Sequence, residues 1–173
     1  SDRNRLCVYE LATGKKNYVS EKFDSSVEGF VWNKDNKSLS FIGVWHGTLN
    51  LYQANFKGEV KQITNEWADY GSISLANNGN KLLATKASMS HPTDIYIVTP
   101  GKDAKSTKVE QITRENDHIL NQLNLGKCEQ RWVKTTDGKQ MLVWIMLPSN
   151  FDANKKYPTL LFCEGGPQSP VSQ

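Results

Sequence analysis

The sequence lacks any segment that would place it in a membrane. Its longest apolar run, residues 141–147, is far too short to span a bilayer as a helix. The N-terminus also lacks a positively charged start followed by an apolar core, so the given residues show no signal peptide pattern. We therefore expect no membrane span in this chain.

Cysteine is scarce. Cys7, Cys128 and Cys163 are the only three among 173 residues, they lie far apart, and none has a histidine at metal-ligand spacing. This pattern argues against a disulfide framework and against a zinc site. We expect three buried structural cysteines, no metal and no cofactor.

A strong excess of either charge is absent as well. Lysine and arginine number 21 against 18 acidic residues, and the net charge of +3 is spread along the chain. Single lysines beside turns indicate solvated faces, and the tryptophans lack the basic surroundings of a base-stacking platform. We expect no nucleic-acid partner. We also expect most tryptophans to be buried, namely Trp32, Trp45, Trp67, Trp132 and Trp144.

The sequence does contain an internal repeat. Residues 30–64 and 72–113 align with an offset of 43 positions and end in the nearly identical VKQIT and VEQIT. Self-similarity at such a period indicates a repeat architecture. The aligned pairs are Trp32 with Leu75, Leu39 with Leu82 and Asn36 with Gly79, and tyrosines recur at Tyr9, Tyr52 and Tyr96.

Each unit has the pattern of short strands. Residues 49–51 and 95–97 alternate as two half-buried strands would. The segments NKDNKS and NNGNK supply hairpin turns, because Asn, Asp and Gly tolerate a positive φ. Four short strands in a repeat of about 40–50 residues are typical of a β-propeller blade.

The first residues follow the same pattern. Residues 6–20 match the second half of a unit, so the chain enters in mid-blade and then runs through two complete blades. About two and a half blades is fewer than the roughly four to eight of a closed propeller. We predict a mainly β fold that begins with a partial β-propeller. An open meander or a β-sandwich with fortuitous periodicity is the alternative.

A different pattern follows the repeat. Residues 117–127 form a linker with at most one helical turn, and residues 128–147 form two strands around a turn at 136–139. A polar loop comes next, and then an apolar strand over residues 159–163 that we expect to be buried. The predicted division is blades over 1–116, this linker, and a truncated second domain over 128–173.

The order of these motifs resembles the prolyl oligopeptidase family of serine peptidases, most closely its dipeptidyl peptidase and acylaminoacyl peptidase branches. The segments that carry the resemblance are EQIT, then TTDGKQMLVWIMLP and KKYPTLLFCEGGPQ, with the blade motifs WNKDNKSLSFIG and PTDIYIV. It covers essentially the whole chain. It implies a β-propeller joined to a C-terminal α/β-hydrolase domain, of which the chain would hold the first strands.

This resemblance gives the Gly-Gly-Pro turn a chemical role. In α/β-hydrolases a backbone N–H after the third strand is one donor of the oxyanion hole, and it must approach the oxyanion to about 3 Å. The resemblance implies that Gly166 is this donor and that Gly165 supports the turn. A tight β-turn is the alternative. Glu164, where many relatives carry His or an aromatic residue, is either a ligand for the substrate's α-ammonium or a surface carboxylate.

The catalytic triad is missing. The sequence has no G-x-S-x-G elbow, and His46, His91 and His118 all precede the hydrolase pattern, so we expect them to be structural or exposed. The resemblance therefore implies a nucleophile, acid and base beyond Gln173, and an inactive fragment of a serine exopeptidase. The alternatives are a non-catalytic propeller that binds peptide or protein partners, and an esterase.

The resemblance also implies partners and a compartment. A propeller that covers the active site admits short, unfolded chains, so the parent enzyme would act on short peptides. An incomplete propeller exposes strand edges, and an ordered fragment should self-associate through them. The resemblance implies a periplasmic protein, with the cytoplasm as the alternative.

Overall fold

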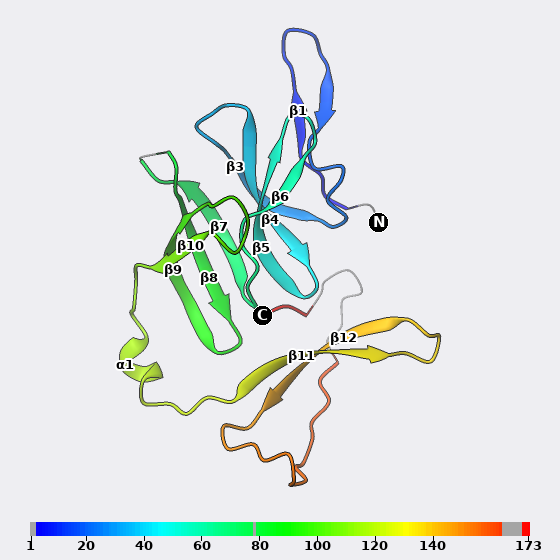
Figure 1. Ribbon diagram of the computed structural model, residues 1–173, viewed down its shortest axis with the longest axis vertical. Helices are drawn as coiled ribbons and strands as arrows, with labels where there is room; N and C mark the ends of the chain where they lie inside the picture. Colours follow the sequence, from blue (N-terminus) through cyan, green and yellow to red (C-terminus); the bar gives the residue numbers. More distant parts are fainter. Residues whose placement is uncertain (1–2, 78, 164–170) are drawn as a thin grey trace.

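The computed structural model describes residues 3–77, 79–163 and 171–173 (Figure 1). Its regular structure is almost all β, in an eight-stranded sheet and two separate hairpins, which confirms the predicted fold class. The strands are β1 (Cys7–Tyr9), β2 (Lys16–Tyr18), β3 (Val27–Trp32), β4 (Ser38–Trp45), β5 (Thr48–Asn55), β6 (Val60–Gln62), β7 (Asp69–Leu75), β8 (Leu82–Ser88), β9 (His91–Thr99), β10 (Lys108–Gln111), β11 (Lys127–Lys134) and β12 (Gln140–Leu147), and the helix is α1 (Asp117–Leu120).

The large sheet consists of two four-stranded antiparallel meanders, β3 to β6 and β7 to β10 (Figure 1). One parallel pair, Leu49 of β5 with Asp69 of β7, connects their ladders. The aligned residues of the repeat take the same place in each meander, because Trp32 pairs with Leu39 and the strands 43 positions later pair in the same register. The strand pairing thus follows the sequence repeat.

Equivalent irregularities recur in the two meanders. The turn after β3 contains Asn36 with φ +51, and the turn after β7 contains Gly79 with φ +72, as their alignment predicts. Asn and Gly are the residues that adopt this left-handed conformation most easily. Both first strands also carry a register shift near their start, after Val27 in one meander and after Tyr70 in the other.

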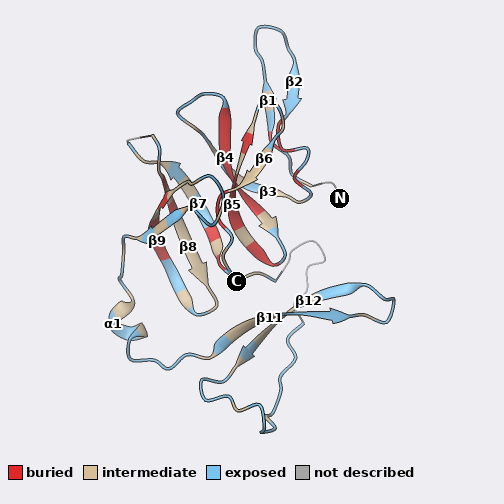
Figure 2. Ribbon diagram, viewed as in Figure 1, coloured by how far each residue is buried: buried red, intermediate tan, exposed pale blue. Residues whose placement is uncertain are grey.

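Packing between neighbouring units buries both faces of β4 and β5, the central strands of the first meander (Figure 2). Strand β4 sends Phe41 into a cluster shared with the N-terminal hairpin and its neighbour Ile42 into a cluster shared with β7 to β9. Side chains alternate between the faces of a strand, so a strand between two units must be apolar at successive positions. This explains why β4 is apolar without interruption from Phe41 to Trp45.

Strand β9 differs from β4 because its residues are buried only at alternate positions. Asp94, Tyr96 and Val98 are buried, whereas Ile95 is 42% exposed. The strand is half-buried, but its buried face begins with a carboxylate that has hydrogen-bonding partners. The sequence pattern of alternating isoleucines does not reveal this.

The remaining elements lie beyond the large sheet. Helix α1 is one turn long, as predicted for the linker, and among the described residues no helix is long and apolar enough to cross a bilayer. Strands β11 and β12 pair in register from Lys127 with Leu147 to Lys134 with Gln140. Gly138, with φ +82, lies in the turn that joins them, as the sequence predicts.

The prediction of a buried strand over residues 159–163 is wrong. These residues form no strand, and Leu160, Leu161 and Phe162 are 98%, 85% and 83% exposed. A strand needs a partner for its backbone N–H and C=O groups. No strand among the described residues pairs with this segment, so its apolar side chains stay in solvent.

Two expectations of burial are also wrong. Cys7 and Cys163 are exposed and Cys128 is partly buried, and all three are free thiols. Trp32, Trp45, Trp67 and Trp132 are between 40% and 54% exposed. Trp32 and Trp45 end their strands, Trp67 lies in a loop, and Trp132 belongs to a two-stranded hairpin. Each therefore lies outside the buried centre of the sheet.

Candidate functional site

The predicted oxyanion-hole loop falls outside the described residues. Glu164, Gly165 and Gly166 all lie in this gap, so their predicted roles stay predictions. The described residues that follow the gap are placed beside the first two meanders. The hydroxyl of Ser172 and the backbone N–H of Gln173 both donate hydrogen bonds to the carboxylate of Asp69 at the start of β7.

Asp69 links three segments of the chain. Its carboxylate also accepts a hydrogen bond from the backbone N–H of Leu49 at 3.0 Å. Burial raises the pKa of Asp69 above its usual value, and the hydrogen bonds from Ser172, Leu49 and Gln173 partly offset this effect. The carboxylate thereby holds residues 171–173 against the junction of the two meanders.

The turn between β4 and β5 contacts the β11–β12 hairpin. His46 and Gly47 both have a positive φ, +50 and +67, which is the backbone of a tight two-residue hairpin turn. A Cβ at position 47 would lie 2.8 Å from Nε1 of Trp144 and 2.9 Å from the side chain of Leu142. Glycine is therefore required at this contact for both its conformation and its size.

Aromatic rings extend the same contact. The His46 ring stacks on Trp45 at 4.4 Å between centroids and meets Trp132 edge-on at 5.1 Å, while Trp67 meets Trp144 edge-on at 5.8 Å. The Trp144 indole N–H is buried and has no hydrogen-bond partner among the described residues. These contacts hold the hairpin that precedes the predicted loop against the meanders.

A pocket of about 350 Å³ opens on the same side of the sheet. Its charged groups are Lys86 and Glu66, whose Nζ and Oε1 atoms are 3.1 Å apart. The ammonium group also lies 4.2 Å from the centre of the Tyr96 ring, a cation–π distance. The full lining comprises Glu66, Trp67, Ala68, Lys86, Ala87, Ser88, His91 and Tyr96.

Tyr70 forms a further contact with this ion pair. Its hydroxyl donates a hydrogen bond to Oε2 of Glu66. Burial raises the pKa of Tyr70 well above its usual value, and the Glu66 carboxylate raises it further. The phenol therefore stays protonated and remains a donor. The pocket can offer a fixed ammonium group and a fixed carboxylate to a polar ligand such as a peptide.

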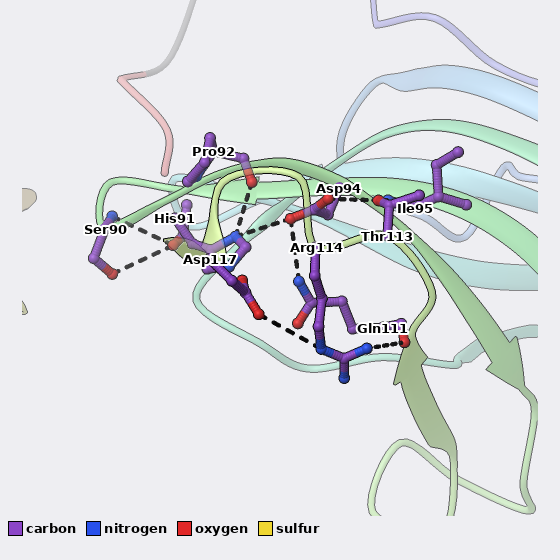
Figure 3. A network of polar contacts seen from close by, with 10 residues as sticks. Ser90, His91, Pro92, Asp94, Ile95, Gln111, Thr113, Arg114 and Asp117 are labelled. Atoms are coloured by element: carbon purple, nitrogen blue, oxygen red, sulfur yellow. Dashed lines mark hydrogen bonds and ion pairs between the residues drawn. The ribbon is translucent and has the colours of Figure 1, made fainter. Parts of the chain in front are cut away.

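A second polar network surrounds Asp94, which is 3% exposed (Figure 3). Its carboxylate accepts hydrogen bonds from Thr113 Oγ1 at 2.5 Å and Gln111 Nε2 at 3.1 Å, and His91 Nδ1 lies 3.9 Å away. Thr113 Oγ1 in turn accepts the backbone N–H of Ile95 at 2.9 Å. This network connects the start of β9 with the residues that follow β10.

The first meander repeats the network with a neutral amide. Asn50 Oδ1 accepts a hydrogen bond from Thr64 Oγ1, and Thr64 Oγ1 accepts the backbone N–H of Leu51, both at 2.9 Å. Our sequence reasoning missed both networks. The available signal was the threonine that ends both VKQIT and VEQIT, together with the polar residue two positions before Tyr52 and before Tyr96.

The positions of the three histidines agree with the prediction that they are structural or exposed. His46 lies at the hairpin contact, His91 beside Asp94, and His118 is exposed on α1. None of them hydrogen-bonds a serine hydroxyl within the described ranges. In the same ranges no group of three or more His, Cys, Asp or Glu side chains is placed to hold a metal ion.

Comparison with known proteins relates the whole chain to peptidases. No family model matches it. The chain is 42% identical over 174 aligned positions, its full length, to the dipeptidyl-peptidase 5 of Porphyromonas gingivalis, and it covers 25% of that protein. The chain thus spans about a quarter of the length of this curated relative.

Solved structures show the same fold. The acylaminoacyl peptidase of Pyrococcus horikoshii matches with a TM-score of 0.66 at 16% identity, over 84% of this chain and 21% of that one. The β-propeller domain of the trilobed protease of Pyrococcus furiosus matches with a TM-score of 0.53 at 19% identity, over 71% of this chain and 33% of that one. The meanders are therefore propeller blades in their fold.

Proposed function

Because the chain belongs to the prolyl oligopeptidase family of peptidases, we propose that it is a segment of a serine exopeptidase of the dipeptidyl peptidase type. The observation that carries the proposal is the 42% identity to a dipeptidyl peptidase along the full length of the chain. The identity extends through both the blades and the hairpin that follows them. A scaffold propeller would have no use for that hairpin.

The proposed reaction is hydrolysis of a peptide bond near the N-terminus of a short peptide. A serine located beyond Gln173 attacks the carbonyl carbon, and a histidine oriented by an aspartate accepts the serine proton. The backbone N–H of Gly166 donates a hydrogen bond to the oxyanion that forms, while Gly165 leaves room for the approach. Residues 1–173 alone lack the triad and are inactive.

The described geometry supports this proposal through its placement of neighbouring residues. Residues on both sides of the predicted loop lie against the blades, the β11–β12 hairpin through Gly47 and Ser172 through Asp69. Both contacts lie beside the pocket that contains Glu66 and Lys86. In the proposed enzyme this pocket borders the path by which a peptide reaches the active site.

Two measurements test the proposal. The full-length gene product should hydrolyse dipeptidyl 4-nitroanilides and take up one equivalent of a fluorophosphonate serine probe. Residues 1–173, produced alone, should do neither. Stoichiometric labelling of the short chain would contradict the fragment proposal, and absence of labelling in the full-length protein would contradict a serine peptidase.

Glu164 has a separate test. We propose that its carboxylate lies near the substrate's α-ammonium group. The Glu164→Gln variant of the full-length enzyme should then raise KM for dipeptidyl substrates with a free amino group and leave KM for N-acetylated substrates unchanged. An equal KM for wild type and variant on free-amino substrates would show a surface carboxylate instead.

A non-catalytic binding propeller is the second proposal, because the described residues contain no Ser–His pair in hydrogen-bonding contact. Sequencing the gene downstream of the Gln173 codon distinguishes the two. A continuing frame with G-x-S-x-G, then Asp and His, supports the peptidase, and an immediate stop codon supports the binding module. An esterase would hydrolyse 4-nitrophenyl butyrate in preference to the dipeptidyl substrates.

Compartment and association are proposed on similar grounds. We place the protein in the periplasm, which fractionation of the source cells would test against the cytoplasm. The short chain should self-associate through strand edges and through Leu160, Leu161 and Phe162, which are apolar and exposed. A monodisperse monomer in light scattering would contradict this association.

A further inference from the structure

A cavity of about 610 Å³ separates the N-terminal hairpin from the first meander, and its size is within the usual range of small-ligand sites. It lies at the ends of the strands where β3 turns into β4. The His46–Gly47 turn lies at the opposite ends, so the cavity is remote from the β11–β12 hairpin. Its lining residues are Val8, Glu10, Lys15, Asn17, Trp32, Asn36 and Phe56.

Two aromatic rings form a corner in this cavity. The rings of Trp32 and Phe56 are 5.7 Å apart between centroids and stand at 88° to each other. Trp32 is 45% exposed and Phe56 is 37% exposed, so part of each side chain is open to solvent. A flat apolar face with a perpendicular wall can receive one small ring that is apolar on one side.

Polar side chains surround the corner and keep hydrogen-bonding capacity. Asn17 donates a hydrogen bond from Nδ2 to the backbone carbonyl of Phe56 at 2.8 Å. That contact leaves its Oδ1 atom without a partner in the described part of the chain. The same holds there for the side-chain amide of Asn36, the Lys15 ammonium and Oε1 of Glu10. Planar amide and carboxylate groups can each hydrogen-bond to a pair of neighbouring hydroxyls.

The equivalent groove in the next repeat lacks this character. The groove between the two meanders has a volume of about 420 Å³ and contains Leu75 at the position that aligns with Trp32. Gly79 replaces Asn36, and Thr99 and Pro100 lie where Phe56 lies in the first unit. Of these two grooves in the described part of the chain, one packs without an aromatic corner, so blade packing does not require the pair Trp32 and Phe56.

We propose that this cavity binds the ring of a neutral carbohydrate. The C–H face of a pyranose would lie on the Trp32 indole against the edge of Phe56. Its hydroxyls would bond to the free atoms of Asn17, Asn36 and Glu10. A carbohydrate ring combines one apolar face with several hydroxyls at its rim, which is the combination that this cavity complements.

The charge of the rim excludes other ligand classes. The opposite charges of Glu10 and Lys15 cancel, so the rim attracts neither an anion nor a cation overall. A nucleotide would find no cluster of basic side chains here. A proline-rich peptide also has rings that stack on aromatic groups. Such a peptide needs an extended aromatic groove rather than a single corner.

Saturation-transfer difference NMR on the full-length protein tests the proposal. The probes are methyl β-D-glucopyranoside, methyl β-D-galactopyranoside, methyl N-acetyl-β-D-glucosaminide and the peptide acetyl-Pro-Pro-Pro-amide. We expect transfer to the ring C–H protons of at least one glycoside. Trp32→Ala should weaken that binding about tenfold or more, since it removes the stacking face.

Matched variants separate binding from folding. Leu75→Ala, at the aligned position of the other groove, should leave glycoside affinity unchanged. Glu10→Ala changes only the rim and should weaken affinity about threefold. No transfer to any glycoside at about 10 mM would overturn the proposal. Binding that survives Trp32→Ala, or transfer to the proline peptide alone, would also overturn it. Peptidase activity is measured separately, so the outcome does not depend on it.

Discussion

Gly47 and Trp144 approach so closely that a Cβ on the glycine would stand 2.8 Å from the indole Nε1. The contact joins the turn of a propeller blade to the hairpin that follows the blades. The backbone carbonyl of Val171 lies 3.1 Å from the same Cβ position. Three segments that are distant in sequence therefore meet at one position where only glycine fits.

Gly47→Ala should destabilise the protein by about 2–4 kcal/mol, because alanine resists φ +67 and its methyl group collides with Trp144. Urea unfolding followed by tryptophan fluorescence measures this loss. Gly58→Ala is the matched control. Gly58 has φ +74 but nothing within 4 Å of a Cβ, so only about 1 kcal/mol should be lost. Equal losses for the two variants would contradict a packed contact at Gly47.

Thr113→Val should cost more stability than Thr64→Val. Both remove a hydroxyl that bridges a side-chain oxygen and a backbone N–H, but Thr113 serves the buried Asp94 carboxylate and Thr64 serves the Asn50 amide. Hydrogen bonds to charged groups are the stronger, so we expect about 2–3 against about 1 kcal/mol. Faster amide hydrogen exchange at Ile95 and Leu51, respectively, would locate each effect. A larger loss for Thr64→Val would refute the role assigned to the charge.

Tyr52→Phe should change stability in alkaline solution. Burial raises the pKa of Tyr52 from its ordinary value of 10.0 to about 12. Since the folded-state pKa lies above the unfolded one, the contribution to stability is complete below pH 10 and is lost as the pH rises to 12. The variant cannot ionise. Between these pH values it should gain about 1–3 kcal/mol relative to wild type, measured by urea unfolding at pH 8 and pH 11.5. A parallel pH dependence for both proteins would contradict this account.

A double-mutant cycle tests the pair in the 350 Å³ pocket. Lys86→Met keeps the aliphatic part of the side chain but removes the charge that pairs with Glu66 and faces the Tyr96 ring. We expect Lys86→Met and Glu66→Gln to cost about 1–2 kcal/mol each, with a coupling energy of about 0.5–1 kcal/mol. The coupling should shrink at high salt, because Glu66 is partly exposed. Additive losses would mean that the two groups act independently.

The repeat was the strongest information in the sequence. The offset of 43 residues aligns strand ends, and the pair Asn36 and Gly79 foretells two left-handed turns that the structure contains. Such features are predictable because they depend on neighbouring residues and on backbone conformation. The β11–β12 hairpin around Gly138 is predictable for the same reason.

Burial was less predictable, because it depends on neighbours that are distant in the sequence. Trp32 is a large apolar residue of the kind expected in a core, yet it ends a strand and is 45% exposed. Asp94 is charged, yet it is only 3% exposed, because Thr113 and Gln111 donate hydrogen bonds to its carboxylate. The apolar residues 160–162 lack a pairing strand among the described residues. The predicted site residues Glu164, Gly165 and Gly166 rest on family resemblance, and residues 164–170 lie outside the described part.

The single backbone pair between Leu49 and Asp69 has a mechanical consequence. Within each meander, consecutive ladders run along whole strands, whereas the boundary between meanders depends mainly on side chains such as Leu51 and Tyr70. Under tension the boundary should therefore yield first and each meander should yield later as one unit. A force–extension trace should therefore show discrete steps, first for separation of the two meanders and then for unfolding of each meander.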